Sequence, residues 1–131
     1  MNITLQDPFC LIIDVIERDE RLPSMRCAIT VEADQFEQRL LYTDNIWVSC
    51  EGWNSFVRNL AANADNGAEL VDMSNRISLR VEQSGSEYLL LFQGTRTSAL
   101  GTICKAAVQA PMHRDGFAVL SRQFVEFNQS E

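Results

Sequence analysis

The chain has 131 residues, of which 46% are hydrophobic and 22% are charged, and its formal net charge is −7. This is enough apolar material for one core but too little chain for two, so we expect a single domain over residues 1–131 and exclude a disordered acidic chain. The acidic excess repels phosphate, which argues against binding to nucleic acid or to an anionic membrane.

The N-terminal half carries strand patterns. Residues 9–17 are β-branched and apolar, which predicts a strand, and the polar residues 18–24 follow as a turn. Residues 25–33 alternate with a period of two, which predicts a half-buried antiparallel strand. The apolar face of that strand consists of Met25, Cys27, Ile29, Val31 and Ala33.

A weaker strand pattern continues from Phe36 to Tyr42 after an expected turn at residues 33–34. Asp44 and Asn45 are typical turn residues and predict a second turn before a short strand at residues 46–49. The N-terminal half therefore predicts a meander of about four strands.

The period then changes to that of a helix. Apolar residues recur at helical spacing between residues 53 and 61, with Ser49 as the predicted N-cap and Glu51 in the first turn. Residues 63–67 predict the end of the helix. The apolar stripe consists of Trp53, Phe56, Val57, Leu60 and Ala61.

The second half returns to strands. The sequence predicts a short strand at residues 68–72, a hairpin at residues 77–92 that turns at 84–86, a polar loop at 93–98 and a strand at 100–108 that a break at 109–111 ends. Apolar spacing from Phe117 to Phe127 predicts a second helix capped by Asp115. The order of elements predicts an α+β fold: antiparallel sheet built from meanders, with two helices packed on one face, in two layers.

The cysteines and the start of the chain favour a cytoplasmic protein. The first seven residues have neither a positively charged start nor a long apolar stretch, so we expect no secretory signal, and no apolar run has the roughly 18–20 residues that a membrane helix needs. No CxxC spacing occurs, which favours buried, reduced thiols over a metal or redox site. The four cysteines are Cys10, Cys27, Cys50 and Cys104.

No catalytic motif is present. His113 is the only histidine, so a histidine-based metal site is excluded, and the phosphate-binding, nucleophile-elbow and EF-hand patterns do not occur. We therefore predict no catalytic, cofactor-binding or metal-ligating residue and no cofactor. An enzyme whose site the fold assembles from scattered carboxylates and a cysteine stays open as an alternative.

The charge is divided unevenly along the chain. Residues 1–72 carry 13 acidic and 5 basic residues, whereas residues 73–131 carry 5 and 6. An acidic surface attracts a basic partner, although the same charge also aids solubility. Trp47 alternates with Ile46 and Val48 and is expected on the open face of the sheet, where it could anchor a protein interface. The predicted protein-interface residues are Trp47, Asp19, Glu20, Glu32, Asp34 and Glu37.

Part of the chain resembles a known family. Residues 53–60, Trp-Asn-Ser-Phe-Val-Arg-Asn-Leu, resemble the W-x-x-F-x-x-x-L helix of the WapI-type bacterial immunity proteins. The resemblance covers roughly residues 46–128, through the strand at 69–72, the paired strands at 76–92 and the closing helix at 115–127. It implies a small acidic cytosolic protein that neutralises a toxin domain from the same locus, without catalytic residues.

Three classes of function remain at this point. The leading hypothesis is a non-catalytic protein-binding module with a basic protein partner, and an immunity protein is its most specific form. The second is a small-molecule-binding or regulatory domain with a pocket between the sheet and the helices, and the third is the enzyme described above.

Overall fold

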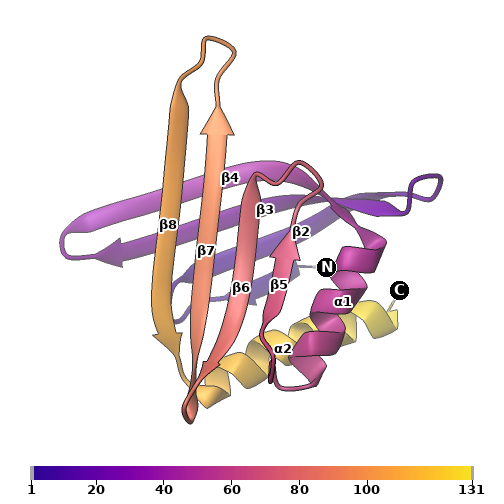
Figure 1. Ribbon diagram of the computed structural model, residues 1–131, viewed down its shortest axis with the longest axis vertical. Helices are drawn as coiled ribbons and strands as arrows, with labels where there is room; N and C mark the ends of the chain where they lie inside the picture. The colour runs from indigo at the N-terminus through magenta and orange to yellow at the C-terminus, as the bar shows by residue number, and fades with distance from the viewer. Residues whose placement is uncertain (1, 131) are drawn as a thin grey trace.

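Two antiparallel sheets and two helices make up the protein. The computed structural model describes residues 2–130, and its strands form two four-stranded sheets in the orders β1-β2-β3-β4 and β5-β6-β7-β8. Every strand pairs with its sequence neighbour, so each sheet is a meander, and the predicted α+β class is confirmed (Figure 1). The elements are β1 (Asn2–Leu5), β2 (Cys10–Asp19), β3 (Ser24–Gln35), β4 (Gln38–Ser49), α1 (Cys50–Ala61), β5 (Ala68–Val71), β6 (Ile77–Ser84), β7 (Glu87–Thr97), β8 (Ile103–Met112) and α2 (Arg114–Ser130).

The first sheet has the turn expected within residues 18–24, but it differs from the prediction at the other two expected turns. The β3–β4 hairpin turns at Phe36 and Glu37, which both have left-handed backbones with φ of 55° and 61°. Such a two-residue turn favours Asn-Gly, so Phe-Glu carries no sequence signal, and the predicted turn at residues 33–34 is wrong. The predicted turn at Asp44 and Asn45 is also wrong, because β4 runs unbroken through both residues.

Two segments of the second sheet were predicted too short. Residues 93–97 belong to β7 instead of a polar loop, and β8 continues through the expected break to Met112. The long β7–β8 hairpin extends past the end of β6, so these polar residues are paired without being buried (Figure 1). Pro111 lies within β8, at the edge of the sheet, where a proline does not interrupt the pairing.

Helix α1 forms as the sequence predicts. The Ser49 hydroxyl accepts a hydrogen bond from the Gly52 amide at 3.0 Å, which confirms the N-cap. The stripe of Trp53, Phe56, Val57 and Leu60 is buried, whereas Ala61 is exposed. The helix therefore presents an apolar face that is one residue narrower than expected.

Helix α2 begins one residue before the predicted cap. Asp115 lies in the first turn, and His113 precedes the helix. His113 accepts the Phe117 amide on its carbonyl at 3.0 Å and the Asp115 amide on Nδ1 at 3.2 Å. The side chain of His113 thus acts as a helix cap, a role that the sequence did not indicate.

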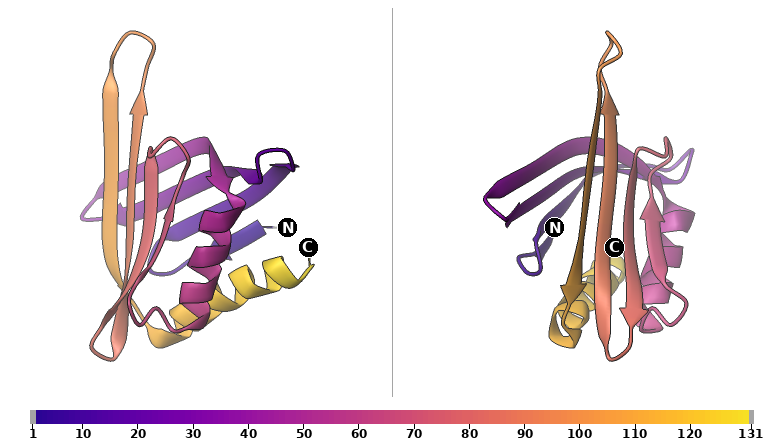
Figure 2. Two further views of the ribbon diagram at one scale, coloured as in Figure 1. Left: turned by 45° about the vertical axis from the view of Figure 1, so that its right-hand side comes forward. Right: turned by 60° about the vertical axis from the view of Figure 1, so that its left-hand side comes forward.

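The core lies where the two sheets and the helices meet. The strands of one sheet cross those of the other, α1 lies beside β5, and α2 runs from the end of β8 across the base of the molecule toward α1 (Figures 1 and 2). The Trp53 ring packs against Phe124 and Phe127 of α2 at centroid distances of 5.1 and 5.3 Å. Burial of these large rings supplies much of the hydrophobic stabilisation.

A close contact joins the two sheets. The Tyr42 ring of β4 lies against Gly94 of β7 and 5.2 Å from the Phe92 ring. A Cβ at Gly94 would lie 2.5 Å from Cζ of Tyr42, so a side chain there would force the sheets apart. Gly94 is needed here for this approach of a ring to the backbone.

Candidate functional site

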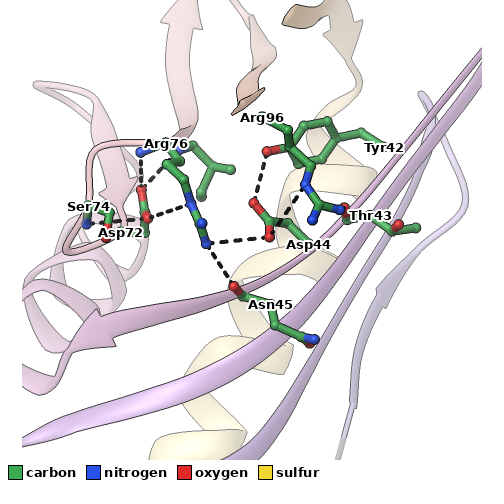
Figure 3. Close-up of polar contacts among 9 residues, drawn as sticks. Tyr42, Thr43, Asp44, Asn45, Asp72, Ser74, Arg76 and Arg96 are labelled. Atoms are coloured by element: carbon green, nitrogen blue, oxygen red, sulfur yellow. Dashed lines mark hydrogen bonds and ion pairs between the residues drawn. The ribbon is translucent and has the colours of Figure 1, made fainter. Parts of the chain in front are cut away.

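The outer edge of β4 is closed by the second sheet. Arg96 donates from Nη1 to the Thr43 carbonyl at 2.9 Å, and Arg76 donates from Nη2 to the Asn45 carbonyl at 2.9 Å. The amide of Met73 donates to the Trp47 carbonyl at 2.8 Å. These three carbonyls alternate along β4 and point away from β3, so the contacts pair three acceptors at the edge of the first sheet, and Figure 3 shows the two that involve arginines.

A buried carboxylate holds these two arginines in place. Asp44 is 8% exposed and accepts from the Tyr42 hydroxyl at 3.1 Å and from Arg76 at 3.4 Å. Its Oδ1 also lies 4.0 Å from Nε of Arg96. Burial and the Asp44 carboxylate raise the pKa of Tyr42 to about 12, so the phenol stays protonated and donates.

Asp72 organises the loop that carries Arg76. Its carboxylate accepts the backbone amides of Arg76 at 2.6 Å and Ile77 at 2.9 Å. The buried carboxylates of Asp44 and Asp72 therefore both accept hydrogen bonds from nearby donors (Figure 3). The cluster is therefore a connection between the sheets and lacks a free reactive group of its own.

The edge of β1 is closed in another way. The side-chain amide of Gln123, in α2, accepts from the Thr4 amide and donates to the Thr4 carbonyl, both at 2.7 Å. Helix α1 lies alongside β5 at the near edge of the second sheet (Figures 1 and 2). Three of the four sheet edges are thus covered by other parts of the chain.

The fourth edge, β8, is open. The amide of Ser98 donates to the carbonyl of Thr102, which fixes the even-numbered residues of β8 as those bonded to β7. The odd-numbered residues therefore direct their backbone groups outward, and among residues 2–130 no strand pairs with that side. The outward donors and acceptors belong to Ile103, Lys105, Ala107 and Gln109, and Pro111 adds a carbonyl without an amide hydrogen.

Two grooves flank this open strand. The first, which we call the acidic groove, has a volume of about 780 Å³ and is lined by residues 6–10, 32–36 and 108–111. Its charged lining residues are Asp7, Glu32 and Asp34, all acidic. The second, the basic groove, has about 480 Å³ and is lined by residues 39–43, 104–106 and Arg96, and its charged lining residues are Arg39, Arg96 and Lys105.

The β3–β4 hairpin separates the grooves. The acidic groove is lined by the end of β3 and meets β8 at residues 108–111. The basic groove is lined by the start of β4 and meets β8 at residues 104–106. The hairpin therefore crosses β8 near Ala107, and it projects beyond β8 (Figures 1 and 2). Phe36 at its tip is 90% exposed.

The structure divides the predicted acidic surface into two parts. Asp34 and Glu37 lie at the β3–β4 tip together with Glu32, which pairs with Arg39 at 2.6 Å. Asp19, the last residue of β2, and Glu20, in the turn that follows, lie beside the opposite end of β3. The two parts are separated by most of the length of a 12-residue strand, about 35 Å at a rise of about 3.4 Å per residue.

Asp19 and Trp47 lie apart from the acidic groove and do not form one surface patch with the other predicted interface residues. The Asp19 carboxylate accepts the Arg21 amide at 2.9 Å, so it stabilises its own turn. Trp47 is 37% exposed, while Ile46 and Val48 are buried, as the alternation predicts. Trp47 pairs with Arg26, six residues along β3 from Glu32, so it lies away from the acidic groove.

Several residues at the grooves had no role in the sequence analysis. Asp7, Arg39, Arg96 and Lys105 were counted only as charges, and β8 was not recognised as an open edge. Pro111 could have given a signal, because a proline inside a strand favours an edge position.

The cysteines are unpaired, but they are not all buried. Cys27 is buried, Cys10 and Cys50 are half-buried, and Cys104 is exposed on β8. The expectation of four buried thiols is therefore wrong for Cys104, which pairs with Arg96 in the part of the β7–β8 hairpin that extends past the end of β6. Burial and the Asp14 charge raise the pKa of Cys27 to about 12, which leaves that thiol protonated and a poor nucleophile.

The described part of the chain has no candidate metal cluster or membrane-spanning helix, and comparisons with known proteins find no significant match. Within residues 2–130, no cluster of three or more His, Cys, Asp or Glu side chains is placed to hold a metal ion. None of the helices described over that range is long and apolar enough to cross a membrane. No protein-family model matches the chain, and neither the curated proteins nor the solved structures contain a significant match.

Proposed function

We propose that this chain is a non-catalytic protein-binding module that takes its partner along the β8 side. The observation that carries the proposal is the open edge of β8 between two grooves whose lining charges have a single sign each. Natural proteins close or blunt the edges of their sheets, and an open edge is a template for another chain. Each of the other three edges has another part of the chain against it, so the edge of β8 stands out.

The partner presents basic side chains to the acidic groove. Asp7, Glu32 and Asp34 line this groove, and Glu37 lies at the neighbouring hairpin tip. A surface of one sign speeds encounter with the opposite sign and loses that advantage in salt, because the Debye length falls from about 10 Å at 0.1 M to about 3 Å at 1 M. Phe36 at the rim supplies apolar area for the contact.

In its narrowest form the module is an immunity protein that neutralises a toxin domain in the bacterial cytoplasm. The resemblance over residues 46–128 and the net charge of −7 support this form. Four unpaired cysteines fit a reducing compartment. A reading frame for a toxin domain immediately upstream of the gene would be direct support.

The volume of the acidic groove favours a second candidate function, a small-molecule-binding or regulatory domain. At about 780 Å³ it falls in the size range of small-molecule sites. A regulatory domain would then bind an organic cation there. Saturable binding of a small cation that Asp34→Asn weakens, without any protein partner, would favour this candidate.

The test compares two pairs of acids after the partner has been captured from the native host. The double variant Asp34→Asn, Glu37→Gln removes charge beside the acidic groove, and the matched control Glu20→Gln, Glu51→Gln removes the same charge elsewhere. We expect the first to slow association at low salt about tenfold, and the control to leave it within about twofold. Equal rates for wild type and both variants would contradict the proposal.

A further inference from the structure

We infer that the partner contributes an extended segment that joins the second sheet as a fifth strand beside β8. This inference deepens the proposed function, on which it rests, by naming the mode of binding. Strand addition uses main-chain hydrogen bonds for affinity and the alternate side chains for selectivity. Both requirements are met along β8.

The backbone of β8 offers a full ladder. The outward amides are those of Ile103, Lys105, Ala107 and Gln109, and the outward carbonyls are those of the same residues and of Pro111. A partner strand finds a donor and an acceptor at every second residue until Pro111, where only a carbonyl remains. Because Pro111 has no amide hydrogen, the ladder ends there, and this end fixes the register of the added strand against β8.

The β3–β4 hairpin supplies a floor for the added strand. It projects past β8, so its inner surface beyond β8 is without a covering strand (Figure 1). Ala33 and Leu40, which are register partners near its tip, are only partly buried against the core. An added strand would cover these two side chains and extend the crossed packing of the sheets by one strand.

A second copy of this chain does not fit the same edge. Full antiparallel overlap of two β8 strands places the twofold axis near Ala107, midway between Ile103 and Pro111. The β3–β4 hairpin also crosses β8 near Ala107, so the hairpins of both copies would need the same space. A partner that presents a single extended segment avoids this collision.

The two grooves define the charge order of the segment. Its part beside residues 108–111 faces Asp7 and Asp34, and its part beside residues 104–106 faces Arg39 and Arg96. An antiparallel segment therefore carries basic residues at its amino end and acidic residues at its carboxyl end. Small or β-branched residues between them fit over the hairpin.

The probe is a synthetic nine-residue peptide with two lysines at the amino end, alternating threonine and valine in the middle and two glutamates at the carboxyl end. Amide hydrogen exchange of the intact protein is followed by NMR with and without it. We expect the peptide to slow exchange at Ile103, Lys105, Ala107 and Gln109 by about tenfold or more, as new hydrogen bonds form. The same peptide with alternate backbone amides methylated cannot donate and serves as the control.

A protein variant tests the ladder from the other side. Ala107→Pro removes an outward donor without touching the bonds to β7, and Ala107→Val keeps the donor. We expect the first to weaken peptide binding about tenfold, which corresponds to about 1.4 kcal/mol, and the second to change it less than about twofold. The native fold of Ala107→Pro is checked by the unchanged exchange of Cys104 and Val108.

The outcomes separate this inference from the function on which it rests. Binding of the peptide without slower exchange at the four outward amides overturns strand addition, as does equal binding of the methylated peptide or no binding at millimolar concentration. Protein binding at the acidic groove survives any of these results if the Asp34→Asn, Glu37→Gln variant still slows association with the native partner. Both fail if that variant has no effect.

Discussion

The edge strands β4 and β8 differ in what their outward backbone groups contact. On β4, three successive outward carbonyls bind Arg96, Arg76 and the Met73 amide. On β8, five successive outward positions have no strand beside them, and grooves lie on both sides of the crossing hairpin. Contacts within the chain pair these three carbonyls of β4, whereas no strand pairs with the outer side of β8 among residues 2–130.

The difference teaches where to look for function in a small β-rich domain. Buried polar groups such as Asp44 attract attention, but its contacts with Arg76 and Arg96 join the two halves of the chain, and its contact with Tyr42 lies within β4. The side chains of β8 have no unusual features, yet its outward amides and carbonyls offer more hydrogen-bonding groups to a partner than the cluster around Asp44 does. Exposed edges are costly to keep because they invite aggregation, and for that reason the open edge of β8 carries the proposed function.

The largest expected effect lies on the closed side, where α1 covers β5. Phe56 is fully buried and packs against Phe124 at 5.0 Å. Phe56→Ala should cost about 3–5 kcal/mol of unfolding free energy, measured by urea denaturation. A melting temperature within a degree or two of the parent would show that the stripe is not buried.

Removal of the carboxylate that closes the β4 edge comes next. Asp44→Ala leaves the Tyr42 hydroxyl without its acceptor. It also removes one carboxylate from beside Arg76 and Arg96, although Nε of Arg76 still lies 3.9 Å from Oδ2 of Asp72. Since both arginines are partly exposed, at 43% and 57%, we expect a loss of about 2 kcal/mol, less than for a fully buried pair. Asp34→Ala on the open side should stay within about 0.5 kcal/mol, and equal losses at the two sites would remove the contrast between the edges.

The closed edge should also respond to alkaline pH. Burial and Asp44 raise the pKa of Tyr42 to about 12, whereas a tyrosine in an unfolded chain titrates near 10. The folded protein therefore keeps a proton that the unfolded chain loses, and stability falls as pH rises from about 10 to about 12. Cys27, with a pKa also raised to about 12, begins to contribute above about 8.5.

Tyr42→Phe separates these two contributions. The variant loses about 1 kcal/mol at neutral pH for the missing hydrogen bond, but its further loss between pH 9 and 12 should be smaller than that of wild type. Denaturation midpoints at several pH values provide the measurement. Parallel curves for the two proteins would mean that Tyr42 titrates normally.

The smallest effect concerns the thiols, which contrast the two strands directly. Without reductant, thiol titration of the denatured protein should report four free groups. In the native protein, Cys104 on β8 should react first and the buried, protonated Cys27 on β3 last. Fast reaction of Cys27, or a protected Cys104, would contradict the burial of the first side chain and the exposure of the second.

The sequence predicted those parts of the fold that depend on local periodicity. The stripe from Trp53 to Leu60, the alternation from Met25 to Val31 and the cap at Ser49 all follow from spacing within one element. The four strands of the N-terminal half were counted correctly only because two errors cancelled. The strand β1 was missed, and β4 was divided at Asp44.

The candidate site depends on contacts that no local pattern contains. Asp44 looks like a turn residue until Arg76 and Arg96, more than 30 residues away, are placed beside it. The openness of β8 follows from which strands are its neighbours, and sequence order alone does not give that. The predicted interface acids Glu32, Asp34 and Glu37 do meet at one end of β3, whereas Asp19 and Glu20 lie at the other.

The most direct test of the contrast between the two edges is amide hydrogen exchange along β8 in the free protein. If the outer edge is open, exchange should alternate: Cys104, Ala106, Val108 and Ala110, bonded to β7, should be protected, whereas Ile103, Lys105, Ala107 and Gln109 should exchange about a hundredfold faster or more. At the β4 edge, the same experiment should find the Met73 amide protected, because it donates to the Trp47 carbonyl at 2.8 Å. Uniform protection along β8 would mean that something already covers its outer edge, and it would contradict the account.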